Sequence, residues 1–144
     1  MSKRRQSREA ALMALYQLEM NGDAFKENVE YFFEFCEIED DLRNFASLLY
    51  NGVRSNFAHI NSLVESVSEN WKISRMGKVD ISILRMAIYE LNYLDDVPVN
   101  VTINEAVEIG KKFGTEDTPA FVNGILDHLV KHKQIDVSKK KTRE

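Results

Sequence analysis

The segment that most constrains the fold is DISILRMAIYELNYL, which runs from residue 80 to residue 94. At about 100° per residue around a helix, its apolar side chains cover an arc of roughly 160°, wider than the stripe of an ordinary surface helix. A helix with so wide an apolar face contacts more than one neighbour, and we therefore expect it to be the central helix of the core. The apolar set comprises Ile81, Ile83, Leu84, Ala87, Ile88, Leu91 and Leu94.

The other side of this segment carries polar and aromatic residues, which predict one polar seam on an otherwise buried helix. Residues 79–83 alternate between apolar and polar, as a strand would. The whole segment nevertheless has no glycine or proline and is longer than a typical strand, so a helix is favoured. The residues of the predicted seam are Ser82, Arg85, Tyr89, Asn92 and Tyr93.

Hydrophobic periodicity predicts helices along the rest of the chain as well. We expect one over residues 2–20, one over 28–36, one between Pro98 and Gly114, and a last one that starts at Thr118 and Pro119. Threonine can cap the free N–H groups of that last helix, and proline suits its first position. Between residues 45 and 71 the pattern is interrupted at Asn56, so one bent helix and two separate helices both remain open. About seven helices and an all-α fold follow.

The length of 144 residues fits a single domain whose core needs no disulfide. The single cysteine, Cys36, lies at helical spacing from Val29, Phe32 and Phe33, which predicts a small core side chain. One thiol suits a reducing, cytoplasmic compartment. No apolar run approaches the roughly 20 residues of a membrane span, and no signal peptide is apparent. We therefore expect a cytoplasmic protein.

The net charge of −4 is unevenly distributed along the chain. Residues 19–41 carry nine carboxylates and one lysine, whereas both ends are basic. The run from Ser138 is charged and has no hydrophobic pattern, so we expect a domain over 1–137 and a disordered tail over 138–144. The basic residues of the C-terminal end are Lys131, Lys133, Lys139, Lys140, Lys141 and Arg143.

The basic residues of the N-terminal end are Lys3, Arg4, Arg5 and Arg8, which precede the first acidic residue. If the first helix begins as early as Arg4, then Arg4 and Arg8 are neighbours at i, i+4 and Arg5 lies about 100° away. Three guanidinium groups would then project from one end of the helix. The alternative is a solvated N-terminal tail.

The sequence shows little catalytic chemistry. His128 and His132 have i, i+4 spacing, but no third ligand can be assigned, so a metal site is not expected. The segment from Gly110 to Gly114 has too few glycines for a phosphate loop. Carboxylates are abundant, but we expect them to be solvated. The chain is therefore expected to be no enzyme and to hold no cofactor.

Four strings carry a resemblance to a known family: RRQSREAALMALYQLE at the start, then LRMAIYEL, VPVNVTINEAVEIGKKFG and FVNGILD. Together they cover nearly the whole chain and resemble the NusB family of bacterial transcription antitermination factors. The resemblance implies an all-helical fold of two small bundles packed across each other. It also implies a protein that binds the single-stranded boxA element of ribosomal leader RNA together with NusE, a small-subunit ribosomal protein. Such proteins help RNA polymerase to pass terminators within an antitermination complex.

The resemblance assigns RNA-binding roles to two parts of the chain. Arg4, Arg5 and Arg8 match the family's basic motif, although Gln6 and Ser7 stand where relatives can have further basic residues. Asp117 and Phe121 match the part of the family that lines the RNA surface near the first helix. Phe121 also falls outside the apolar stripe of its own helix, where an aromatic ring can stack on an unpaired base.

The resemblance further matches Tyr16 and Asp80 to positions that the family uses against NusE. Two other readings stay open alongside an RNA-binding adaptor. One is an accessory domain of a ribosomal RNA cytosine methyltransferase system, in which similar domains occur. The other is a homodimer that hides its RNA-binding face.

Overall fold

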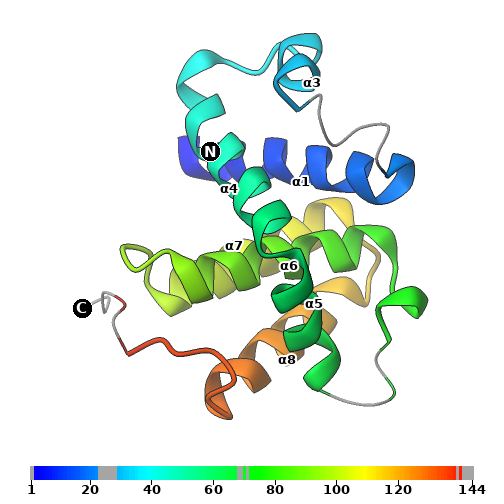
Figure 1. Cartoon of the computed structure of the whole chain (residues 1–144), viewed down its shortest axis with the longest axis vertical. Helices are drawn as coiled ribbons and strands as arrows, with labels where there is room; N and C mark the ends of the chain where they lie inside the picture. The colour runs from blue at the N-terminus through cyan, green and yellow to red at the C-terminus, as the bar shows by residue number, and fades with distance from the viewer. Residues whose placement is uncertain (1, 23–28, 68–69, 71, 139, 141–144) are drawn as a thin grey trace.

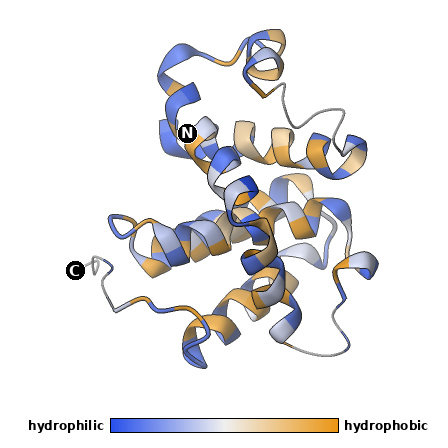
Figure 2. Ribbon diagram, in the orientation of Figure 1, coloured by the Kyte–Doolittle hydropathy of each residue, from blue (hydrophilic) through white to orange (hydrophobic). Residues whose placement is uncertain are grey.

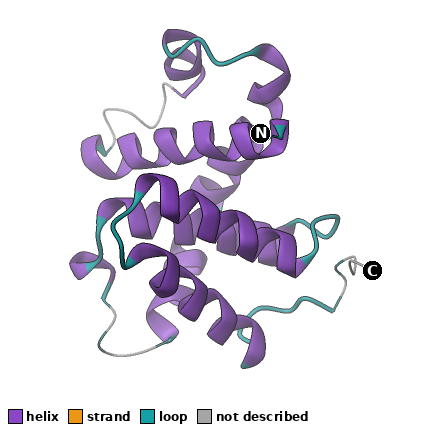
Figure 3. Cartoon of the chain, turned by 180° about the vertical axis from the view of Figure 1, so that it is seen from behind, coloured by secondary structure: helices purple, strands orange, loops and turns teal. Residues whose placement is uncertain are grey.

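The computed structural model describes residues 2–22, 29–67, 70, 72–138 and 140. These residues form seven α-helices and one short 3-10 helix, η1, and contain no strand (Figures 1 and 3). The all-helical prediction is therefore confirmed. The elements are α1 (Lys3–Asn21), α3 (Val29–Phe35), α4 (Asp40–Ser55), α5 (Phe57–Ser66), η1 (Ile73–Arg75), α6 (Lys78–Tyr93), α7 (Val99–Phe113) and α8 (Thr118–Lys131).

The helices form two groups that pack across each other. In the first group α1, α3 and α4 contact one another, and α4 continues into α5 (Figure 1). In the second group α6, α7 and α8 contact one another. Helix α6 also packs against α1, α4 and α5, so it joins the two groups. Figure 2 shows that the body of α1 is largely hydrophobic, whereas its N-terminal end is hydrophilic.

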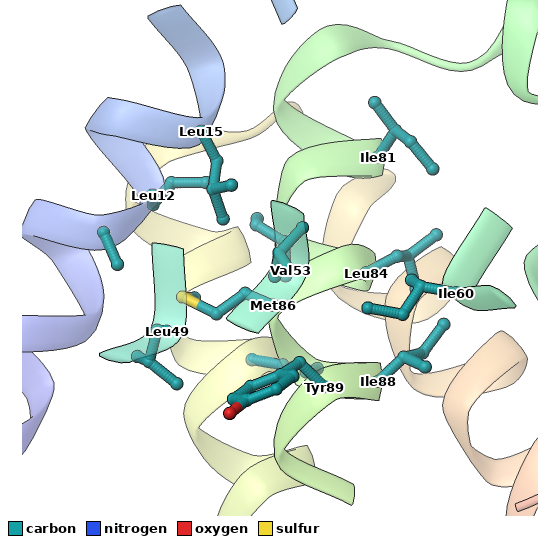
Figure 4. Packing of buried hydrophobic residues seen from close by; sticks show 14 of the residues in the cluster. Leu12, Leu15, Leu49, Val53, Ile60, Ile81, Leu84, Met86, Ile88 and Tyr89 are labelled. Atoms are coloured by element: carbon teal, nitrogen blue, oxygen red, sulfur yellow. The ribbon is translucent and has the colours of Figure 1, made fainter. Parts of the chain in front are cut away.

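Helix α6 is the central helix, as its sequence predicts. Eleven consecutive residues, from Ile81 to Leu91, are buried, and Leu84 and Ile88 are fully inaccessible (Figure 4). The prediction of an exposed polar seam is largely wrong, because Ser82, Arg85 and Tyr89 are buried too. Other helices cover this side.

The polar groups of Arg85 and Ser82 are covered because both find hydrogen-bond partners inside the fold. Arg85 donates hydrogen bonds to Asn61 at 2.9 Å and to Glu19 at 2.5 Å. Its guanidinium carbon lies 4.4 Å from the ring centroid of Phe57. Ser82 donates to the backbone carbonyl of Lys78 at 2.7 Å. Buried polar groups are tolerated when they are paired in this way.

Asn56 separates two helices, which decides between the alternatives that the sequence left open. Its backbone adopts φ −120° and ψ 24°, outside the helical region, between the end of α4 and the start of α5. Its side-chain amide donates to the carbonyl of Gly52 at 2.8 Å and thereby caps α4. Trp71, the last residue of the predicted pattern, lies outside the described residues.

Two local predictions are wrong. Cys36 is exposed, because α3 ends at Phe35 and only Val29 and Phe33 are buried. Thr118 is the first residue of α8 and does not cap it. Its buried hydroxyl instead accepts a hydrogen bond from the Thr115 backbone N–H at 2.9 Å and donates one to Asp80 at 2.7 Å, so it joins α8 to α6.

The C-terminal segment approaches the end of α6. Lys140 is buried, and its Nζ donates to the carbonyls of Glu90, at 2.9 Å, and Leu94. A cation is favourable at a helix C-terminus, where carbonyls lack helical partners. Residues 139 and 141–144 lie outside the described residues, so the domain boundary at 137 and the disordered tail stay predictions.

Gly52 and Gly124 provide a matched test of the packing around α6. A Cβ atom on Gly52 would lie only 2.1–2.6 Å from ring carbons of Tyr89, whereas a Cβ on Gly124 meets nothing within 4 Å. Gly52→Ala should destabilise the fold by about 1–3 kcal/mol, because the packed ring must move. Gly124→Ala should be neutral or stabilise by up to about 1 kcal/mol through helix propensity. Urea unfolding measures both, and equal midpoints would contradict the packing described here.

Candidate nucleic-acid interface

The N-terminal basic residues lie on an ordered helix and not in a solvated tail. Ser2 is the N-cap of α1, and its hydroxyl accepts a hydrogen bond from the Arg5 backbone N–H at 3.1 Å. Such a cap satisfies one of the free N–H groups of the first turn. Arg4, Arg5 and Arg8 are therefore fixed relative to the helices packed around them.

Arg8 is buried, so the prediction that three guanidinium groups project from one end of the first helix is wrong for this residue. Only 4% of its side chain is exposed. Its Nε and Nη2 each lie 2.8 Å from a carboxylate oxygen of Glu90, in a bidentate ion pair. The hydroxyl of Thr102 donates to the same carboxylate at 3.3 Å. The expectation that carboxylates are solvated is therefore wrong for Glu90, which is 1% exposed.

Arg5 forms a second bidentate pair, with Glu105 of α7. Its Nε lies 3.1 Å from Oε1, and its Nη2 contacts Oε2. The Arg5 side chain is 32% exposed and that of Glu105 is 15% exposed, so this pair lies at the boundary with solvent. Glu105 also accepts a hydrogen bond from Arg8 Nη1 at 3.4 Å and therefore bridges the two arginines.

The hydrogen bond from Arg5 lowers the pKa of the Glu105 carboxyl below its ordinary value. A carboxyl whose pKa is lower in the folded state adds stability above its unfolded pKa. That stability is lost as the pH falls through the folded pKa. The pair is therefore fully formed at neutral pH and weakens only in acid.

Arg4 is the most exposed of the three arginines. Its guanidinium carbon lies 3.9 Å from the ring centroid of Phe45 on α4, in cation–π contact. Stacking of this kind orients the planar group and leaves its N–H edges able to donate. Next to it, Lys3 pairs with Asp41.

Arg4, Arg8 and Glu105 border a surface hollow between the start of α1 and the first half of α7, which we call the arginine hollow. Cations and carboxylates both line it, so its charge is mixed. Its lining residues are Ser2, Arg4, Arg8, Asp96, Val97, Pro98, Val101 and Glu105.

Phe121 lines a second surface hollow, separate from the arginine hollow, which we call the Phe121 hollow. Its ring is half-buried, and it does not line the arginine hollow. Asp117, the exposed N-cap of α8, lies four residues before it. The residues that line the Phe121 hollow are Asn70, Lys72, Arg75, Met76, Gly77, Asp80 and Phe121.

Contacts between α1 and α7 show where the two hollows lie along α1. Arg5 pairs with Glu105 at the middle of α7, whereas Glu9, further along α1, accepts from Lys112 at 2.8 Å near the end of α7. The two helices therefore run in the same direction, and the chain passes from the end of α7 to Phe121. The arginines and Phe121 lie toward opposite ends of α1, a helix about 28 Å long.

Lys72 and Arg75 are basic residues that sequence reasoning did not select. Both are exposed and share a hollow with Phe121. An aromatic ring beside cations is a typical surface for single-stranded nucleic acid. Their i, i+3 spacing in the connection before the central helix was the available signal.

A third hollow is apolar and contains Tyr16, and we call it the Tyr16 hollow. It lies between α1, α3 and the end of α7, and Met13 and Phe113 on its edge are exposed. Val79 lines it, and the next residue, Asp80, lines the Phe121 hollow. The structure thus places Tyr16 and Asp80 on adjoining surfaces. The lining residues are Leu12, Met13, Tyr16, Gln17, Phe32, Cys36, Val79 and Phe113.

The described residues offer neither a cluster that could hold a metal ion nor a helix that could cross a membrane. The rings of His128 and His132 lie 4.1 Å apart, but no group of three or more described His, Cys, Asp or Glu side chains could hold a metal ion. None of the described helices is long and apolar enough to cross a membrane.

The fold and these surfaces define a small two-bundle helical protein with arginines fixed at the start of its first helix. Residues 5–131 match the NusB family. The chain is 50% identical over 137 residues to the transcription antitermination protein NusB of Geotalea daltonii, covering 90% of this chain and 94% of the relative. It is 45% identical over 133 residues to that of Myxococcus xanthus, covering 90% and 95%. This chain belongs to the NusB family.

Solved structures agree with this assignment. NusB of T. maritima aligns with a TM-score of 0.80 at 36% identity, covering 89% of this chain and 90% of that one. The antitermination factor NusB in a complex with NusE and double-stranded RNA aligns with a TM-score of 0.82 at 26% identity, covering 92% and 98%. The two-bundle arrangement expected from the resemblance is therefore confirmed.

The buried pair of Arg8 and Glu90 predicts a strong stability effect. Glu90→Ala should cost about 3–5 kcal/mol, because it leaves Arg8 buried without its main partner. The double variant Arg8→Met, Glu90→Leu should recover much of that loss, because neither charge then remains. Urea unfolding measures both.

Glu108→Ala is the control for this comparison, because Glu108 lies on α7 with 45% of its side chain exposed. It should change stability by less than about 1 kcal/mol. A loss in Glu90→Ala as small as in this control would show that the pair does not hold the fold together.

Proposed function

We propose that this protein is an RNA-binding transcription antitermination factor. It binds boxA-type RNA of ribosomal leader transcripts together with a NusE ribosomal protein, and acts in the cytoplasm within the RNA polymerase antitermination complex. It is no enzyme and uses no cofactor. Relatives named as antitermination proteins support the proposal, as does the likeness to a NusB–NusE–RNA complex. The observation that carries it is the presentation of Arg4 and Arg5 on a capped helix.

Arg4 and Arg5 are the arginines that contact RNA in this proposal. The stacked guanidinium of Arg4 can donate to phosphate oxygens along its edges. Arg5 uses Nε and Nη2 for Glu105, so this carboxylate does not engage its Nη1, which can donate to a phosphate oxygen. Arg8 supports binding differently: buried against Glu90, it fixes the start of α1 on α6.

Phe121 supplies the second contact. Its ring can stack on an unpaired base while Lys72 and Arg75 bind the adjacent phosphates. Asp117 is a carboxylate near this ring, and it can accept a hydrogen bond from a base amino group. An RNA strand that reaches both hollows follows the length of α1.

The Tyr16 hollow is the proposed site for NusE. Its apolar lining suits a protein partner, because buried apolar surface drives protein association. Helix α3, which contributes Phe32 to this hollow, also carries the exposed carboxylates Glu30 and Glu34. These favour a basic protein, as RNA-binding ribosomal proteins are. Asp80 borders the same surface.

The alternative of an accessory domain for a ribosomal RNA methyltransferase is not favoured, because the reported relatives are antitermination proteins. A homodimer with a masked RNA-binding face stays a prediction. Sedimentation of the purified protein measures its oligomeric state directly.

The RNA proposal predicts a difference between phosphate contacts and stacking. Arg4→Gln with Arg5→Gln should weaken RNA binding and flatten its salt dependence by roughly 0.7 in slope per lost phosphate contact on a single strand. Phe121→Ala should weaken binding by about 1–3 kcal/mol with little change in slope. Fluorescence anisotropy with labelled boxA-type RNA at several salt concentrations measures both.

A matched control removes the same charge elsewhere. Lys111→Gln with Lys131→Gln changes two exposed lysines on α7 and α8. If this control weakens RNA binding as much as the arginine pair does, binding depends on net charge and the site is misplaced.

The partner proposal predicts a separable effect of Tyr16. Tyr16→Ala should weaken binding of NusE and leave RNA binding by the isolated protein unchanged. By linkage, NusE and RNA should raise each other's affinity by the same factor, which calorimetry measures. Tyr31→Ala is the control, since Tyr31 is 72% exposed on α3 and does not line the hollow. Equal losses in the two variants would place the partner elsewhere.

A further inference from the structure

Carboxylates neutralise most of the positive charge at the start of α1. Arg8 is paired with Glu90, Arg5 with Glu105, and Lys3 with Asp41. The sequence suggests a strongly basic cluster, but in the fold its cations are largely compensated. Attraction for RNA phosphates at this end therefore depends on which of these pairs can open.

The two glutamates that hold the arginines differ in their surroundings. Glu90 is buried at the centre of the molecule, and its bidentate pair with Arg8 is inaccessible to a ligand. Glu105 lines the arginine hollow at the edge of solvent, and its partner Arg5 is about one-third exposed. Of the two arginine–glutamate pairs, the Arg5–Glu105 pair is therefore the one that is both accessible and placed where RNA is proposed to bind.

We infer that Glu105 competes with RNA phosphate for Arg5 and thereby limits the affinity of this protein for RNA. The inference rests on the proposed function of the arginines. A phosphate presents two oxygens to an arginine fork, as a carboxylate does, so it can take the place of Glu105 at Nε and Nη2.

The bridge to Arg8 makes this exchange feasible. When Arg5 turns to phosphate, the Glu105 carboxylate keeps its hydrogen bond from Arg8 Nη1, which is 3.4 Å long. The carboxylate is therefore not left without a cationic partner, which would oppose the exchange. Arg8 and Glu90 remain paired throughout and hold α1 in place.

The alternative is that Glu105 positions Arg5 for RNA binding. One substitution distinguishes competition from positioning. Glu105→Gln removes the charge but keeps an oxygen that can accept from Arg5. Competition predicts tighter RNA binding in this variant, whereas positioning by the charged pair predicts weaker binding.

The experiment is a salt titration of labelled single-stranded boxA-type RNA with the full chain. Glu105→Gln should bind about three- to tenfold more tightly at 50 mM salt, with a slope of log K against log salt steeper by about 0.7, as one added phosphate contact gives. Its advantage over the unmodified protein should then shrink by about 2.6-fold at 200 mM salt. Unchanged or weaker binding by a folded Glu105→Gln protein would overturn the inference.

Two controls test whether the gain in RNA affinity comes from competition for Arg5. Glu108→Gln makes the same charge change one turn along α7, at a glutamate that pairs with Lys111 at 3.1 Å. It should give much less gain, and an equal gain would overturn the inference in favour of net charge. In an Arg5→Gln background, Glu105→Gln should give no gain, and a persistent gain would exclude competition for Arg5.

The controls also separate this inference from the proposed function. If Arg4→Gln with Arg5→Gln leaves RNA binding intact, the proposed RNA site fails. If that variant weakens binding while Glu105→Gln does not strengthen it, the RNA site stands and only the competition by Glu105 is wrong. Where Glu105→Gln unfolds, Glu105→Asp serves instead: it keeps the charge but shortens the reach to Arg5, and competition predicts that it too binds RNA more tightly.

Discussion

The bidentate ion pair between Arg8 and Glu90 fixes the geometry on which the surface of this protein depends. It joins α1 to the central helix α6 at a point where both side chains are almost fully buried. A buried ion pair adds little net stability compared with apolar packing, but the loss of either partner is strongly destabilising. Its main consequence is therefore geometric. It sets how the first turns of α1 lie over α6 and α7, and so where Arg4 and Arg5 meet solvent.

The same pair divides the basic N-terminus into residues with different roles. Arg8 lies inside the fold, Arg5 at its boundary, and Arg4 outside on the ring of Phe45. Three arginines within five residues thus become a buried anchor, a cation paired at the boundary with solvent and an exposed cation. Carboxylates contributed by other helices therefore decide how much of this short basic sequence remains unpaired at the surface.

The sequence predicts the helical scaffold well, but it does not reveal which arginine pairs with which glutamate. The wide apolar arc of α6 identifies the central helix, because burial on several sides needs apolar residues around most of the helix. The break at Asn56 is visible as an interruption, but which side-chain bond ends α4 is a matter of local geometry. The burial of Arg8 could not be predicted, because its partners Glu90 and Glu105 lie 82 and 97 residues away in the chain. A partner that distant is fixed only by tertiary packing. The position of Phe121 near the far end of α1 could not be predicted for the same reason.

The first turn of α6 has a consequence for how two ligands share this molecule. Val79 lines the Tyr16 hollow, and its neighbour Asp80 lines the Phe121 hollow while holding the buried hydroxyl of Thr118 at the start of α8. The first turn of α6 therefore contributes side chains to both the apolar Tyr16 hollow and the Phe121 hollow. Under the proposed function, a partner protein bound in the Tyr16 hollow would restrict the motion of residues that line the Phe121 hollow. Communication between two bound macromolecules then requires no rearrangement of the bundles, only the loss of motion in a few shared atoms.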